Sequence, residues 1–211
     1  MRPSQLFDAA ARQRLESAVV EAERATGGEL VVAVVHACDE YGSAGWWAGC
    51  ALAALAFLAL GIFLPALPWT AYLAAQAAAL AAGHGLARLD GVRRRLLPQR
   101  LVARRVAERA RRCFAENGLA RTRGRTGVLI FVALLERRVV VLADEGIHRA
   151  LDPDESWQQV VDLAVDGLRR GQPVEGIEAA VRRCGEILAR HLPAISPNPN
   201  ELPNPPVVLE D

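Results

Sequence analysis

Apolar and polar residues alternate along the chain in patterns that predict helices and strands. Residues 9–25 are expected to form an amphipathic helix, since their apolar positions recur at spacings of three and four: Leu15, Ala18, Val19 and Ala22. The run Glu29–Val35 is continuous and rich in β-branched residues, which is typical of a strand covered on both faces. The first part of the chain therefore predicts a helix followed by a buried strand.

The same patterns return after residue 97. Pro98 can begin a helix, and one apolar stripe runs along the residues that follow it: Val102, Val106, Ala110, Cys113 and Phe114. Two further apolar runs, 127–134 and 138–143, are separated only by a short polar connection, which favours an antiparallel hairpin. Two amphipathic helices are predicted after these strands, with apolar faces through 157–168 and 177–188.

A long apolar stretch interrupts this alternation. No charged residue occurs between Glu40 and Arg88, and Pro65 and Pro68 divide the stretch near its middle. A bilayer core needs about 20 helical residues per crossing, so the stretch is too long for one span and suits two. Tryptophan and tyrosine favour membrane interfaces, and four such rings lie near the predicted ends: Trp46, Trp47, Trp69 and Tyr72. We expect a transmembrane helical hairpin with spans of about 44–64 and 69–86.

The charges predict the orientation of this hairpin. The net charge of +1 hides a basic block, since residues 90–127 contain twelve arginines and three acidic residues. This block follows the second span directly, whereas the connection 65–69 carries no charge, and arginine is enriched on the cytoplasmic side of membrane spans. Residues 1–14 lack the apolar core of a secretory signal. The expected location is the cytoplasmic (inner) membrane, multi-pass, with both termini in the cytoplasm.

These elements predict an α/β fold in four segments. A small sheet, made of a parallel pair plus an antiparallel hairpin strand, is flanked by helices, and the two-helix transmembrane hairpin is inserted after the first strand. Residues 1–43 and 90–192 are the two halves of the α/β domain, and residues 44–89 are the hairpin. Residues 193–211 are rich in proline and poor in core-forming residues, so they are expected to form a disordered tail.

Several short motifs resemble those of one known family. Thr26-Gly27-Gly28-Glu29 precedes the first strand run, and Thr126-Gly127-Val128 opens the second. Glu136-Arg137-Arg138-Val139, Gly146-Ile147, Gly171 and Gly176-Ile177 follow in the same order as in that family. The ensemble resembles the TPM domain, a small α/β module of bacterial envelope and thylakoid proteins, over about residues 8–192 with the hairpin as an interruption.

The resemblance implies two kinds of function. Some family members are associated with phosphatase activity and divalent-cation binding, and others with the assembly or repair of membrane complexes. The family commonly places acidic residues in the loop before the second strand. In this chain the corresponding loop, residues 121–126, contains three arginines instead. Hard cations need oxygen ligands, so this loop departs from the family's pattern for a metal site.

Two acidic pairs are the candidates for a metal site. Asp39 and Glu40 follow the first strand, and Asp144 and Glu145 follow the third. Open α/β sheets place ligands at the carboxyl ends of their strands, so the four carboxylates could converge and hold Ca²⁺ or Mg²⁺. The alternative is that they are solvated turn residues, which the sequence favours. No cofactor is required by any motif in the chain.

Arginines supply a second candidate, an anion or lipid-headgroup site. Arginines beside a membrane span attract anionic lipid, and the simpler alternative is a topology signal. The candidate residues belong to the basic block: Arg93, Arg94, Arg95, Arg104, Arg105, Arg121, Arg123 and Arg125. Nucleic acid is not expected as a partner, because the block has few aromatic residues.

The resulting hypothesis is an integral membrane protein with a cytosolic TPM-like domain that acts as a binding or assembly module. Its expected partners are the lipid bilayer and other membrane proteins, or a second copy through the hairpin. Two alternatives remain: a weak, metal-assisted phosphatase that uses the acidic pairs, and an oligomeric transport component built on the hairpin.

Overall fold

The chain folds into two units that are described separately. The computed structural model describes residues 6–152, 155–194 and 201–209. One unit consists of residues up to Cys38 together with those from Arg104 onward, and the other of Asp39–Ala103. We call them the α/β unit and the helical unit.

A four-stranded mixed sheet forms the centre of the α/β unit, in the order β3-β2-β1-β4. The strands are β1 (Glu29–Val35), β2 (Gly127–Ala133), β3 (Arg138–Ala143) and β4 (Val207–Leu209). β1 pairs in parallel with β2, with Glu29 opposite Gly127 and Val35 opposite Ala133. β3 returns antiparallel to β2, so the predicted parallel pair with an antiparallel hairpin strand is confirmed.

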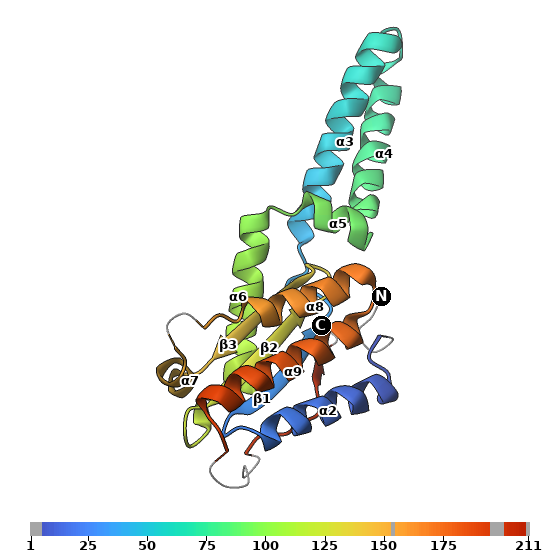
Figure 1. Cartoon of the computed structure of the whole chain (residues 1–211). Helices are drawn as coiled ribbons and strands as arrows, with labels where there is room; N and C mark the ends of the chain where they lie inside the picture. The colour runs from blue at the N-terminus through green and yellow to red at the C-terminus, as the bar shows by residue number, and fades with distance from the viewer. Residues whose placement is uncertain (1–5, 153–154, 195–200, 210–211) are drawn as a thin grey trace. The chain divides into compact units, whose positions relative to one another are not determined.

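Both faces of the central strands are buried, which explains their continuous apolar runs. Every residue of β1 and β2 is buried, including Val32 and Ile130 on one face and Val31 and Phe131 on the other. The first face packs with α2 (Ala9–Arg24), α8 (Gln158–Arg170) and α9 (Pro173–His191), which lie in front of the sheet in Figure 1. The remaining helical segments of this unit are η1 (Leu119–Arg121), α7 (Glu145–Ala150) and α6 (Gln99–Glu116), the last of which begins in the helical unit.

The tail corrects one prediction. Residues 193–211 were expected to be disordered, yet Val207–Leu209 form β4, which pairs in parallel with β1 at Ala33–Val35. An uncovered edge of β1 would leave backbone donors and acceptors of a buried strand without partners, and β4 satisfies them. The prediction of disorder is therefore wrong for β4, while residues 195–200 and 210–211 lie outside the described residues.

Two long helices and one short helix make up the helical unit. They are α3 (Gly42–Phe63), α4 (Trp69–Leu86) and α5 (Asp90–Leu96). α3 and α4 pack along each other (Figure 1), and glycines set their separation. A Cβ on Gly83 would lie 2.6 Å from the Cα of Gly49, and one on Gly49 would lie 2.9 Å from the Leu80 carbonyl oxygen. The two helices therefore touch backbone to backbone.

Two helices thus form at the positions predicted for the hairpin, but their transmembrane character differs. Among the described helices, only α3 is long and apolar enough to cross a membrane by length and composition. α4 lies at the position of the predicted second span, but it does not meet the same criteria of length and apolar composition. A two-helix transmembrane hairpin is therefore not confirmed by the structure.

Substitution of Gly83 by alanine is predicted to weaken the α3–α4 pair. The added Cβ would meet the backbone of Gly49, whereas a Cβ on Gly85 would meet nothing within 4 Å. Because alanine is the better helix former, Gly85→Ala should be neutral or stabilising by up to about 1 kcal/mol. Gly83→Ala should instead cost about 1–3 kcal/mol through overpacking. Thermal unfolding in mild detergent, followed by helical circular dichroism, measures both, and equal midpoints would contradict the close packing.

Candidate functional site

Arg125 joins the basic loop to the second acidic pair. Its Nη2 donates to Asp144 Oδ1 at 3.0 Å, its Nε donates to Asp144 Oδ2 at 3.3 Å, and its Nη1 donates to Glu145 Oε2 at 2.7 Å. Asp144 is only 7% exposed, and it also accepts the backbone N–H of Glu145 at the start of α7. A two-pronged contact to a buried carboxylate is the strong form of this ion pair.

The antiparallel turn of β3 explains why these residues meet. Ala143 at the end of β3 pairs with Val128 at the start of β2, and Arg125 lies just before β2. The backbone N–H of Asp144 donates to the Gly127 carbonyl at 2.9 Å, which fixes this end of the hairpin. The arginine and the carboxylate that the sequence assigned to different candidate sites therefore belong to one ionic cluster.

The same turn separates the two acidic pairs. Val35, at the end of β1, lies opposite Ala133, which in turn lies opposite Arg138 at the start of β3. Asp144 therefore follows the sheet edge where β1 begins, whereas Asp39 follows the edge where β1 ends. Strand direction alone therefore gives no reason for the two pairs to converge, because β1 and β3 end on opposite sides of the sheet. Within the described part of the chain, no group of three or more His, Cys, Asp or Glu side chains could hold a metal ion.

Cation binding by these carboxylates stays a prediction. A cation on Asp144 and Glu145 would have to displace Arg125, which already occupies both carboxylates. In the helical unit, Asp39 Oδ1 accepts the backbone N–H of Tyr41 at 3.2 Å, a turn contact before α3. The backbone carbonyl of Glu40 accepts from Arg93 Nη1 at 3.3 Å.

The candidate arginines fall into two groups. Four of them form ion pairs with nearby acids: Arg93 with Asp90, Arg104 and Arg105 with Glu108, and Arg125 with Asp144 and Glu145. The structure gives no ion pair, over the residues that it describes, to the other four: Arg94, Arg95, Arg121 and Arg123. Arg94 and Arg95 lie on α5, directly after the apolar helices.

Two buried glutamates form hydrogen bonds to the C-terminal segment, and no sequence motif indicates this role. Glu23 Oε1 accepts the backbone N–H of Leu30 at 2.8 Å, and its Oε2 accepts the side-chain amide of Asn204 at 2.8 Å. Glu29 Oε2 accepts the backbone N–H of Leu202 at 3.2 Å. Both carboxylates are at most 5% exposed. Burial, together with the smaller effect of the nearby Glu29 charge, raises the pKa of Glu23 to about 7.

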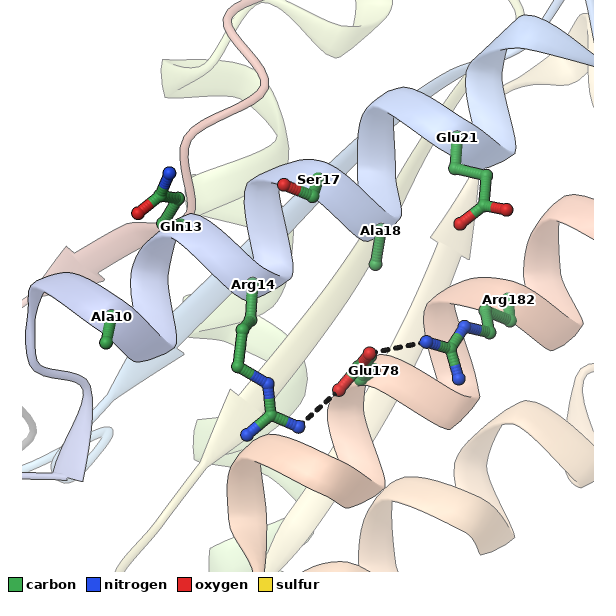
Figure 2. Close-up of a pocket in the computed structure, with 8 residues that line it drawn as sticks. All are labelled: Ala10, Gln13, Arg14, Ser17, Ala18, Glu21, Glu178 and Arg182. Carbon is green, nitrogen blue, oxygen red and sulfur yellow. Dashed lines mark hydrogen bonds and ion pairs between the residues drawn. The ribbon is translucent and has the colours of Figure 1, made fainter.

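A surface hollow lies between α2 and α9 (Figure 2), with a volume of about 390 Å³. Glu178 is at its centre and pairs with Arg14 at 2.6 Å and with Arg182 from the opposite side. Ser17 lines the hollow, but within the described residues its hydroxyl has no hydrogen-bonded base. One carboxylate thus pairs with two arginines, of which Arg14 also pairs with Glu175, and no activated nucleophile is present among the described side chains that line the hollow.

The helical unit carries the largest exposed apolar surface. Its large side chains are between 36% and 78% exposed on α3, α4 and their connection: Trp46, Trp47, Leu55, Phe57, Leu58, Ile62, Phe63, Leu64, Trp69, Leu73, Leu80 and Leu86. Soluble monomers rarely expose contiguous apolar patches beyond a few hundred Å². Nothing in the described part of the helical unit covers these side chains.

The comparisons agree with this architecture. A mixed four-stranded sheet flanked by helices, with a helical pair between β1 and β2, defines a small α/β domain with an inserted helical unit. Residues 96–187 match the family model of the TPM domain, so the chain contains a TPM domain and the resemblance noted in the sequence is confirmed.

One solved structure shares the fold. The NMR structure of BA42 protein from the psychrophilic bacterium Bizionia argentinensis is similar at a TM-score of 0.60, with 17% identity over 96% of this chain and 94% of that chain. At this identity the likeness concerns the fold alone. No curated protein matches the chain.

Loss of Arg125 is predicted to destabilise the α/β unit. Arg125→Ala leaves the buried Asp144 without its cation, and hydrogen bonds to charged groups contribute about 1.5–3 kcal/mol. Arg123→Ala is the matched control, because Arg123 contacts the rest of the protein through its backbone N–H to Glu201. Urea unfolding of both variants measures the difference. Equal losses of unfolding free energy would show that the cluster contributes nothing beyond surface charge.

Glu23 is predicted to make stability depend on pH. The ordinary pKa of the carboxyl is 4.5 and the folded value is about 7, so between these values the folded state binds more protons than the unfolded state. The free energy of unfolding should therefore fall as pH rises from about 4.5 to about 7, and then level off. Glu23→Gln should flatten this part of the profile.

The exposed carboxylate of Glu21, on the same helix, supplies the control. Urea unfolding at a series of pH values compares Glu23→Gln with Glu21→Gln. A profile that flattens equally in both variants would assign the pH dependence to general charge rather than to the buried Glu23.

Proposed function

We propose that this chain is an integral membrane protein whose helical hairpin anchors a TPM domain at the cytoplasmic face of the inner membrane. The observation that carries the proposal is the uncovered apolar surface of α3. Near the middle of this helix, Leu55 and Leu58 are 63% and 60% exposed. At 1.5 Å per residue, the 22 residues of α3 extend about 33 Å. This length matches a hydrocarbon core of about 30 Å.

The packing of α4 against α3 supports α4 as the second span. α4 has 18 residues and no Asp, Glu, Lys or Arg, and it extends about 27 Å. The side-chain amide of its polar residue Gln76 can form a hydrogen bond to α3. When the amide nitrogen is turned toward α3, it lies 2.8 Å from the Ala53 carbonyl oxygen. A side-chain amide that bonds to a neighbouring helix is tolerated in hydrocarbon. Because the glycine contacts hold α4 against α3, α4 enters the bilayer together with α3.

The arginines support the orientation. Arg88 ends the apolar stretch, and Arg94, Arg95 and Arg100 follow it without ion pairs in the described chain. The connection between α3 and α4, residues 64–68, contains no charged residue. Arginine near a span is retained on the cytoplasmic side, so both ends of the hairpin belong there. The TPM domain, which flanks the hairpin in sequence, is placed on the same side by this argument.

For the TPM domain itself we propose a binding or assembly role. The acidic residues that a metal-assisted phosphatase would use are divided between two sheet edges, and Arg125 holds one pair. The phosphatase alternative therefore requires Arg125 to release Asp144. A domain fixed at the membrane surface by a hairpin is suited to bind other membrane proteins or a second copy of this chain.

A charge on the exposed face of α3 is predicted to prevent membrane integration. An arginine at the centre of a span costs about 2.5–3.5 kcal/mol of insertion free energy. Leu55→Arg should therefore shift the full-length protein from the carbonate-resistant membrane pellet toward the soluble or degraded fraction. Leu163, an exposed leucine on α8, gives the control variant Leu163→Arg, which should stay in the pellet. Wild-type protein that is fully extracted by alkaline carbonate would contradict the anchor.

A further inference from the structure

A groove in the helical unit has the composition of a lipid-binding site. Its volume is about 560 Å³, and residues of α3 and α4 line it together with Arg88 just beyond α4. Small residues form the floor, because Gly45 and Gly49 bring the two helices close. The lining is mostly apolar, and its charged member is Arg88 at one end.

The residues on the α4 side form a single stripe that changes from apolar to cationic. Ala77, Ala81 and His84 are spaced by four and three, so they lie on one face of α4, and Arg88 lines the same groove just beyond the end of the helix. The ring of Trp46 meets that of His84 edge-on, with centroids 5.8 Å apart. Arg88 is exposed and has no ion pair within the described residues. The cationic end of the groove is therefore free to bind an anion.

The length of this stripe matches one leaflet of a bilayer. From Ala77 to Leu86, where α4 ends, the helix rises about 14 Å at 1.5 Å per residue, and Arg88 follows two residues later. Half of a hydrocarbon core is about 15 Å. An acyl chain that lies along the stripe from the cytoplasmic interface would thus reach the bilayer midplane, with its headgroup at the level of Arg88.

We propose that this groove binds one anionic phospholipid of the cytoplasmic leaflet, with an acyl chain against Leu80 and Ala81 and the phosphate on Arg88. The inference rests on the proposed membrane anchor and deepens it. Arg88 supplies the charge complementarity, and the apolar lining excludes a free phosphate as the natural occupant. A lipid held here would become a fixed part of the helical unit rather than a passing neighbour.

Native mass spectrometry of the full-length chain, purified in a neutral detergent and delipidated, tests the proposal. Titration with phosphatidylglycerol should give one tightly retained lipid per chain, and phosphatidylcholine should bind more weakly. One arginine near a lipid surface contributes enough attraction for about a fivefold change in affinity, so Arg88→Gln should weaken retention of phosphatidylglycerol by about that factor.

Two matched controls separate a site from general attraction. Arg95→Gln removes the same charge from α5, outside the groove, and should leave retention unchanged. Ala81→Phe fills the groove and should weaken both lipids, whereas Ala82→Phe, at the neighbouring exposed position outside the groove, should not. Equal effects of Arg88→Gln and Arg95→Gln would overturn the proposal. A lipid-free dimer would also overturn it, because a second hairpin would then occupy the groove.

Carbonate extraction of the same wild-type protein tests the membrane anchor separately from the lipid site. If the chain resists extraction but retains no lipid one-to-one, the anchor stands and the lipid site is wrong. If the chain is extracted, both are wrong.

Discussion

The cost of exposing apolar side chains to water is the constraint on which the functional interpretation depends. Burying a large apolar side chain is worth about 1.5–3 kcal/mol, and α3, α4 and their connection leave a dozen such side chains at least 36% exposed. Closer packing of the two helices cannot remove this cost, because Gly49 and Gly83 already bring the backbones into contact. The apolar surface must be covered from outside the helical unit. A bilayer covers all sides of a helical pair at once, which a partner protein on one face does not.

Parallel pairing of β1 and β2 explains how the helical unit can interrupt the α/β unit in sequence. Two adjacent parallel strands need a crossover connection, and the chain leaves the α/β unit after Cys38 and re-enters it at Arg104. The helical unit occupies this crossover and contributes no strand to the sheet. The TPM family match begins at residue 96, at the end of α5 and after α3 and α4. The two long apolar helices thus lie outside the matched segment.

The elements with strong periodicity could be predicted from the sequence, whereas features that depend on strand direction and long-range contacts could not. β1, β2 and β3 were predicted from their apolar runs, but β4 has only three residues within a proline-rich tail. Both acidic pairs follow strands, so the sequence left open that they converge, although it favoured solvated turns; the direction of β3 then decides where each strand ends, and β1 and β3 end on opposite sides of the sheet. The roles of Glu23 and Glu29 depend on contacts with Asn204 and Leu202, which are more than 170 residues away in the sequence, so no local pattern indicates them.

The central claim, that α3 and α4 cross the membrane together, is tested most directly by the side on which their connection lies. In a chain whose four cysteines have been replaced, a single cysteine at Ala66 or at Arg95 can be labelled with a membrane-impermeant maleimide. In right-side-out and inverted vesicles, Ala66→Cys should react only from the outer face and Arg95→Cys only from the cytoplasmic face. Labelling of both positions from the same face would contradict a transmembrane hairpin.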